Sequence, residues 1–103
     1  MEDAVGPVLR MCDDLEFVIR AIQEDNPPES LEVVDHGAYV RVQRSGLLRL
    51  TRASLQRHLG ADFEISQLES IIAAFSGRIR TSSDEVVWNL QTAGASAPEG
   101  GTP

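Results

Sequence analysis

The chain has 103 residues and a mass of 11.2 kDa, which is the size of one small domain. Sixteen acidic residues against nine basic ones give a net charge of -7, which repels nucleic-acid phosphates at long range. Hydrophobic residues make up 42% of the chain, enough for one modest core, so we expect a folded protein that does not bind nucleic acid.

The cysteine content and the hydropathy pattern indicate the cellular setting. Cys12 is the only cysteine, which excludes an internal disulfide and a thiolate zinc site. No stretch approaches the ~18 apolar residues of a membrane span, and the acidic start lacks the pattern of a signal peptide. We therefore expect a cytoplasmic protein without a membrane partner, monomeric in its free form.

The first predicted elements are a strand and a helix. Residues 5–10 read as a strand, and Pro7 favours a sheet edge because proline lacks the backbone N–H. Asp13 and Glu16 resemble a capping box at a helix start. The helix carries an apolar stripe and ends near residues 25–26, before two prolines; the stripe is Leu15, Val18, Ile19 and Ile22.

Residues 31–51 change to a period of two, which is typical of strands. Three apolar pairs mark them: Leu31 and Val33, Val40 and Val42, and Leu48 and Leu50. Short segments with glycine, 36–37 and 44–46, separate the pairs. The pattern predicts a three-stranded antiparallel meander.

Two further helices are predicted in the second half. Thr51 is placed to cap a short helix through Leu59, which Gly60 ends. A second capping box, Ser66 with Glu69, begins a helix that Gly77 ends. Its apolar stripe consists of Leu68, Ile71, Ile72 and Phe75, which favours a core position for Phe75 over the alternative of a contact residue.

The last predicted element is a hairpin of residues 78–81 and 86–90 around the polar turn 82–85. The segment 92–103 is rich in Ala, Gly, Ser and Pro and is expected to be disordered. The sequence thus predicts an α+β fold, with one domain over 1–91 in which antiparallel strands pack with about three helices.

The residues that could carry chemistry do not form a recognisable site. His36 and His58 lack the spacing of metal ligands, and Cys12 has no histidine partner in the sequence. Nucleotide-binding, hydrolase and metalloprotease motifs are absent. We therefore predict a protein without cofactor or metal that is not an enzyme and acts by binding another protein. Two alternatives are a small-molecule-sensing α+β module and, less favoured, a minor enzyme that uses Cys12 or His58.

Five segments in order resemble a known family: VGPVLR at 5–10, EDNP at 24–27, AYVRV at 38–42, LTRASLQRHLG at 50–60 with Phe63, and LESIIAAFSGRI at 68–79. They are similar to the effector, or coupling, protein of bacterial multicomponent diiron monooxygenases, most of all to the toluene monooxygenase branch. The resemblance implies a cofactor-free α+β protein that docks on the diiron hydroxylase component. It also implies that the protein tunes dioxygen activation, coupling and regiospecificity without turning over substrate.

The resemblance also suggests where docking occurs. In the methane monooxygenase relatives, the loop matching 73–78 lies at the hydroxylase interface. The predicted interface residues are therefore Ser76, Gly77 and Arg78, with Ala73, Ala74 and Phe75 beside them. Asn26 is either a helix stop or a docking residue. Tyr39 and Arg41 share one strand face that is either solvated or partner-facing.

Overall fold

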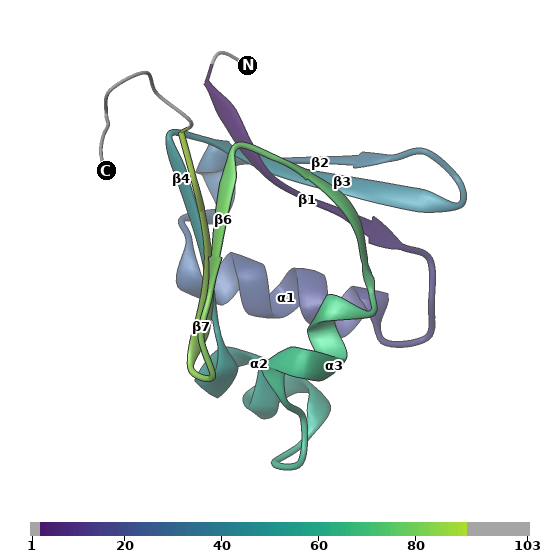
Figure 1. The fold of residues 1–103 in the computed structure, drawn as a ribbon. Helices are drawn as coiled ribbons and strands as arrows, with labels where there is room; N and C mark the ends of the chain where they lie inside the picture. The colour runs from purple at the N-terminus through teal and green to yellow at the C-terminus, as the bar shows by residue number, and fades with distance from the viewer. Residues whose placement is uncertain (1–2, 91–103) are drawn as a thin grey trace.

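The computed structural model describes residues 3–90, in which seven strands form two antiparallel sheets. One sheet has the strand order β2-β3-β1-β5 and the other β4-β7-β6. The elements are β1 (Ala4–Arg10), α1 (Leu15–Asp25), β2 (Leu31–Asp35), β3 (Tyr39–Ser45), β4 (Leu47–Thr51), α2 (Arg52–Leu59), α3 (Ile65–Glu69), β5 (Ile72–Ser76), β6 (Arg78–Thr81) and β7 (Glu85–Asn89), with a 3-10 turn at Pro28–Ser30. Figure 1 shows the two sheets meeting at a corner, with the helices beneath the four-stranded sheet. The predicted α+β fold is confirmed.

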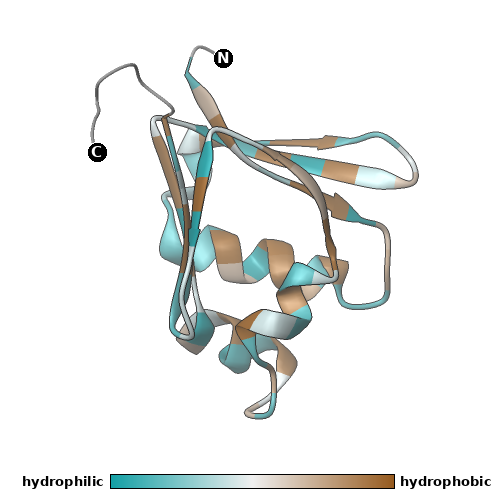
Figure 2. Ribbon diagram, viewed as in Figure 1, coloured by the Kyte–Doolittle hydropathy of each residue, from teal (hydrophilic) through white to brown (hydrophobic). Residues whose placement is uncertain are grey.

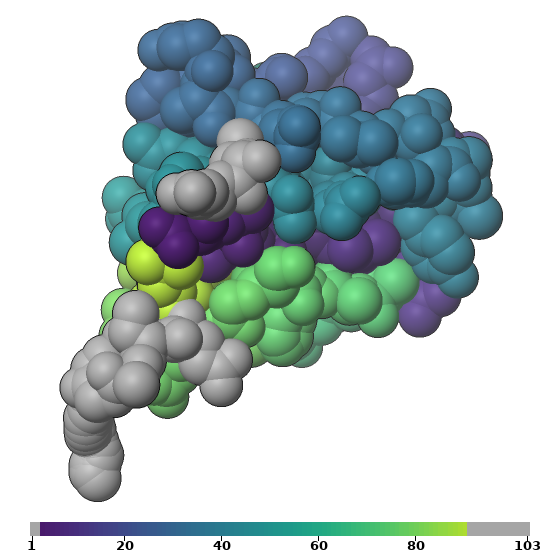
Figure 3. Space-filling view, turned by 90° about the horizontal axis from the view of Figure 1, so that it is seen from above, coloured from purple at the N-terminus to yellow at the C-terminus, as the bar shows by residue number. Residues whose placement is uncertain are grey.

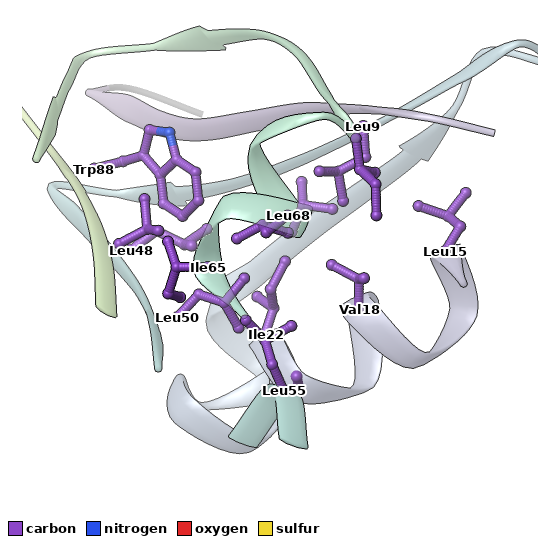
Figure 4. Close-up of a cluster of buried hydrophobic side chains, with 14 of the residues drawn as sticks. Leu9, Leu15, Val18, Ile22, Leu48, Leu50, Leu55, Ile65, Leu68 and Trp88 are labelled. Atoms are coloured by element: carbon purple, nitrogen blue, oxygen red, sulfur yellow. The ribbon is translucent and has the colours of Figure 1, made fainter. Parts of the chain in front are cut away.

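The core lies in the angle between the two sheets and the helices. Its fully buried side chains come from both sheets and all three helices, with Leu9, Ile22, Leu48, Leu50, Leu55, Leu68 and Trp88 among them. Figure 4 shows these side chains converging on one interior. Hydrophobic and hydrophilic segments alternate along α1 in Figure 2, as expected for a helix that buries one face. Burial of this apolar surface is the main force that holds the sheets and helices together.

Several local predictions are confirmed. The predicted first helix forms and ends at the C-cap Asn26. The predicted short helix forms as α2, where the Thr51 hydroxyl accepts a hydrogen bond from the Ser54 amide at 3.2 Å and Gly60 follows with φ +110°. The predicted last hairpin forms as β6 and β7. The predicted boundary at residue 91 and the tail 92–103 lie outside the described residues.

The predicted three-stranded meander is wrong, because only β2 and β3 form its hairpin. β4 leaves that sheet at Gly46 and pairs with β7, where Leu48 faces Trp88 and Leu50 faces Val86. All four of those side chains are fully buried. The period of two identified the strand correctly, and the burial of these side chains against β7 selected its partner.

The predicted edge position of the first strand is also wrong. β1 lies between β3 and β5 in the middle of the four-stranded sheet. Its pairing with β3 holds at Val5 and Val8 but has no partners at Gly6 and Pro7. The sheet accommodates proline because the ladder is interrupted where proline has no N–H to donate.

The predicted third helix is much shorter than its apolar stripe suggested. α3 ends at Glu69, and Ile72–Ser76 instead form β5, which pairs with β1. A short apolar run does not distinguish a helix from a buried strand. Here the run pairs as β5 with the backbone of β1, whose edge would otherwise be open. Phe75 is 42% exposed and therefore does not belong to the core, contrary to the prediction.

The helix N-termini differ from the predicted ones. The N-cap of α1 is Asp14, without a side-chain capping bond, so Asp13 does not close the predicted capping box. At α3 the capping box is formed by Glu64 and Gln67, two residues before the predicted pair. Glutamate fills this role because its carboxylate accepts the same backbone N–H that a serine hydroxyl would accept.

Candidate docking surface

The outer face of the four-stranded sheet is the candidate functional site. The helices lie on the other face, where Val5, Leu9, Val40 and Val42 are buried. On the outer face, the strand register aligns one row of side chains across β2, β3, β1 and β5: Val34, Arg41, Val8 and Ala74. Figure 3 views this face from above and shows β1 lying between β3 and β5. We call it the open sheet face.

A hollow of about 320 Å³ lies on the open sheet face. Its lining consists of Val8 and Arg10 from β1, Tyr39 from β3, and Ala73 and Ala74 from β5. The β1–β5 register shifts between Val8 and Leu9, which inserts an extra residue of β5 at this point. The small alanine side chains of β5 leave space beside the larger side chains of Arg10 and Tyr39, which gives a hollow with room for an inserted side chain.

Most of the predicted interface residues are brought together on or beside this face. Tyr39 pairs with Arg10 across the β1–β3 ladder and is 42% exposed. Ala74 is exposed and Ala73 is half-buried at the edge strand β5. The predicted trio Ser76, Gly77 and Arg78 forms the corner where β5 leads into β6, with Arg78 exposed.

Arg41 lies in the middle of the open sheet face and is half-buried. Its guanidinium donates a hydrogen bond to Nε2 of His36 in the β2–β3 turn, over 3.1 Å. Since arginine can only donate, this contact requires an unprotonated Nε2 on His36. The contact fixes the Arg41 side chain toward the hairpin turn.

Asn26 lies away from the open sheet face and is 3% exposed. Its amide nitrogen donates to the carbonyl oxygens of Ile22 and Arg49, at 2.8 and 2.7 Å, and its oxygen accepts from the Arg49 amide at 3.1 Å. The side chain thus ends α1 and joins it to β4. Of the two interpretations left open by the sequence, the structure favours the helix stop.

A charged cluster lies on the helical side, between α1 and α2. Arg57 and His58 both contact the Glu24 carboxylate, with His58 Nε2 at 2.9 Å from Oε1. Hydrogen bonds from Arg57, which has the larger effect, and from His58 hold the pKa of Glu24 below its ordinary value. The Glu24 carboxylate in turn raises the pKa of Arg57. The Arg57 side chain is 57% exposed and those of Glu24 and His58 are 36% and 28% exposed, so solvent screens this contact between the two helices.

Within residues 3–90, no three His, Cys, Asp or Glu side chains are placed to hold a metal ion. Cys12 is exposed, and among the described helices none is long and apolar enough to cross a membrane. Val8 and Arg10 line this site but were not predicted from the sequence. Their alternation along β1 was visible, but the pairing of β1 with β5 that places them beside Ala74 was not.

Comparison with known proteins identifies relatives over nearly the whole described region. Residues 3–89 match the MmoB/DmpM family. The effector subunit of an alkene monooxygenase system from Xanthobacter autotrophicus strain Py2 is 39% identical over 87 residues, which cover 84% of this chain and 86% of that protein. The predicted resemblance to monooxygenase effector proteins is therefore confirmed, whereas the toluene branch is not.

Solved structures with the same fold include a chain of a phenol hydroxylase–regulatory protein complex, with a TM-score of 0.77 and 23% identity over 85% of this chain and 99% of that one. The regulatory protein B of soluble methane monooxygenase matches with a TM-score of 0.68 and 18% identity, covering 91% of this chain and 70% of that one. The chain therefore belongs to the MmoB/DmpM family, as a non-catalytic effector component of a multicomponent monooxygenase.

Proposed function

We propose that the protein docks through its open sheet face on the diiron hydroxylase component of its monooxygenase and there tunes dioxygen activation, coupling and regiospecificity. The observation that carries this proposal is a sheet with one face packed on the core and the other uncovered among the described residues. The uncovered face presents Tyr39, Arg10 and a small-residue hollow, and tyrosine and arginine are enriched at protein interfaces. The protein acts as a monomer in the cytoplasm.

The relatives support the partner in this proposal. The phenol hydroxylase complex contains a regulatory protein together with the hydroxylase, and the chain matched in it has the present fold. The 39% identical relative is the effector subunit of an alkene monooxygenase system. An aromatic hydrocarbon of the toluene type is our proposed substrate class, and an alkene is the competing class that this relative favours.

The energetic requirement on the docking contacts follows from linkage. An effector shifts a hydroxylase between two states only by binding one of them more tightly. Moving the hydroxylase from 1:99 to 99:1 in favour of the active state requires about 5.5 kcal/mol of differential binding free energy. A few well-packed contacts at the centre of an interface can supply this amount.

The test is the reaction of the reduced hydroxylase with dioxygen, with and without this protein. Wild-type protein should speed oxidation of the diiron site and raise product formed per NADH, with toluene and with propene assayed in parallel. Tyr39→Ala should raise the concentration of this protein needed for half-maximal activation by about 30-fold, because truncation of an aromatic hot-spot contact costs about 2 kcal/mol.

Phe17→Ala is the matched control, since Phe17 is an aromatic side chain on α1 that is 39% exposed. It should activate like wild type. If the reduced diiron site were oxidised at the same rate with and without saturating wild-type protein, the effector role would be excluded. Faster product formation with propene than with toluene would replace the aromatic substrate class by the alkene class.

A further inference from the structure

Arginine is distributed unevenly in this acidic chain. Four strands contain five arginines and no Asp or Glu: β1, β3, β5 and β6. The rest of the chain carries the other four arginines and all sixteen acidic residues. Because β3, β1 and β5 are neighbours and β6 continues from β5, these strands form one carboxylate-free region, which we call the arginine strip.

Pairing follows the same division. Arg20, Arg49, Arg52 and Arg57, all outside the strip, each contact a carboxylate. Over residues 3–90, no strip arginine has a carboxylate within ion-pair distance. Arg44 is half-buried and donates hydrogen bonds to the Ser30 hydroxyl at 2.8 Å and the Leu47 carbonyl at 2.7 Å. The other strip arginines therefore keep their charge available to a partner.

The outward positions of these arginines can be read from the register. Arg10 and Arg41 lie on the open sheet face, on the opposite side from the buried Leu9 and Val40. Arg78 and Arg80 flank Ile79, which pairs with the buried Trp88, so they occupy the outer face of the three-stranded sheet. Positive charge thus lies on both sides of the corner at Gly77.

From this distribution we propose that the hydroxylase surface that receives the open sheet face is acidic, and that the arginine strip orients this net-negative protein on it. The inference rests on the proposed docking function and adds the chemistry of the receiving surface. The carboxylates of α1 lie on the helical side, which is repelled by the same surface, whereas Glu32 on the edge strand β2 shares the open sheet face with Val34. The two faces together therefore select one docking orientation by attraction and repulsion.

A nucleic acid would also be attracted to arginine, but the described features favour a protein. The carboxylates elsewhere leave a net charge of -7, which opposes approach to a phosphate backbone. The strip also contains the hollow lined by Val8, Ala73 and Ala74, which offers shape complementarity to a side chain. Binding to single-stranded DNA is accordingly included as a contrary outcome of the test.

The test is the association rate of this protein with the hydroxylase at low and physiological ionic strength. Arg10→Glu combined with Arg80→Glu should slow association by roughly 10-fold at low salt, within the range that electrostatic steering covers. The wild-type rate should fall as salt shortens the Debye length from about 30 Å to about 8 Å. Arg20→Glu with Arg57→Glu changes the net charge equally outside the strip and should slow association much less.

The outcomes separate this inference from the function on which it rests. Failure of wild-type protein to bind the hydroxylase at any salt concentration would contradict the docking function itself. Normal binding with equal rates for the two double variants, or with no salt dependence, would contradict the acidic receiving surface alone. Retention of the protein on single-stranded DNA at physiological salt would assign the strip to a different partner.

Discussion

Gly77→Ala should destabilise the domain by about 2–5 kcal/mol, combining a left-handed backbone with a clash in a packed region. Gly77 has φ +90°, and a Cβ there would lie 2.5 Å from the Asn89 carbonyl oxygen and 2.6 Å from Val5 Cγ1. Gly46 provides the control, with φ +84° and no atom within 4 Å of a Cβ. Gly46→Ala should cost only about 1–2 kcal/mol, from the backbone conformation alone.

Urea unfolding followed by the fluorescence of Trp88, which is fully buried, measures both variants. If Gly77→Ala and Gly46→Ala destabilised the protein equally, the packing of β1 and β7 against Gly77 would have enough room for a Cβ atom. Gly6 gives a second check, since a Cβ there would meet the Val42 carbonyl oxygen at 2.1 Å. Gly6→Ala should be at least as destabilising as Gly77→Ala.

Asn26→Ala should destabilise the protein by about 2–4 kcal/mol, because it removes three hydrogen bonds and leaves buried backbone groups without partners. The Asn26 amide bonds both the N–H and the carbonyl of Arg49, as a neighbouring strand would do at this edge of β4. The adjacent Asp25 reinforces the junction by accepting from the Thr51 amide at 2.7 Å and from the Ser54 hydroxyl at 2.7 Å.

Gln23→Ala is the matched control for Asn26→Ala, since Gln23 is an exposed amide on the same helix. It should change stability by less than about 0.5 kcal/mol. Thermal and urea unfolding should give the same ranking. If Asn26→Ala were as stable as Gln23→Ala, the hydrogen bonds of Asn26 would not contribute to stability. Asn26 would then again be a candidate docking residue.

Local signals in the sequence predicted the elements that depend on neighbouring residues. The Thr51 cap and the Gly60 stop of α2 are set by a hydroxyl and by a positive φ, both of which act within one turn. The partner of β4 could not be predicted in this way. It depends on the burial of Leu48 and Leu50 against residues of β7 some forty positions later in the chain.

The same distinction explains the candidate site. The alternation of residues predicts Tyr39 and Arg41 as candidates, and the family resemblance predicts 73–78. These residues share one surface because β1 lies between β3 and β5 and pairs with both of them. The predicted helix from Ser66 to Gly77 concealed this arrangement, since Ile71, Ile72 and Phe75 fit a helical spacing as well as a short strand. Asn26, also a predicted docking candidate, instead ends α1 and bonds to β4.

The central claim is that the open sheet face docks on the hydroxylase, and a pair of bulky substitutions tests it most directly. Ala74 on this face and Ala53 on α2 are both exposed alanines. We predict that Ala74→Trp, which fills the hollow, abolishes the increase in product formed per NADH, whereas Ala53→Trp preserves it, with both variants as stable as wild type. Full activation by Ala74→Trp together with loss of activation by Ala53→Trp would contradict the claim and place docking on the helical side.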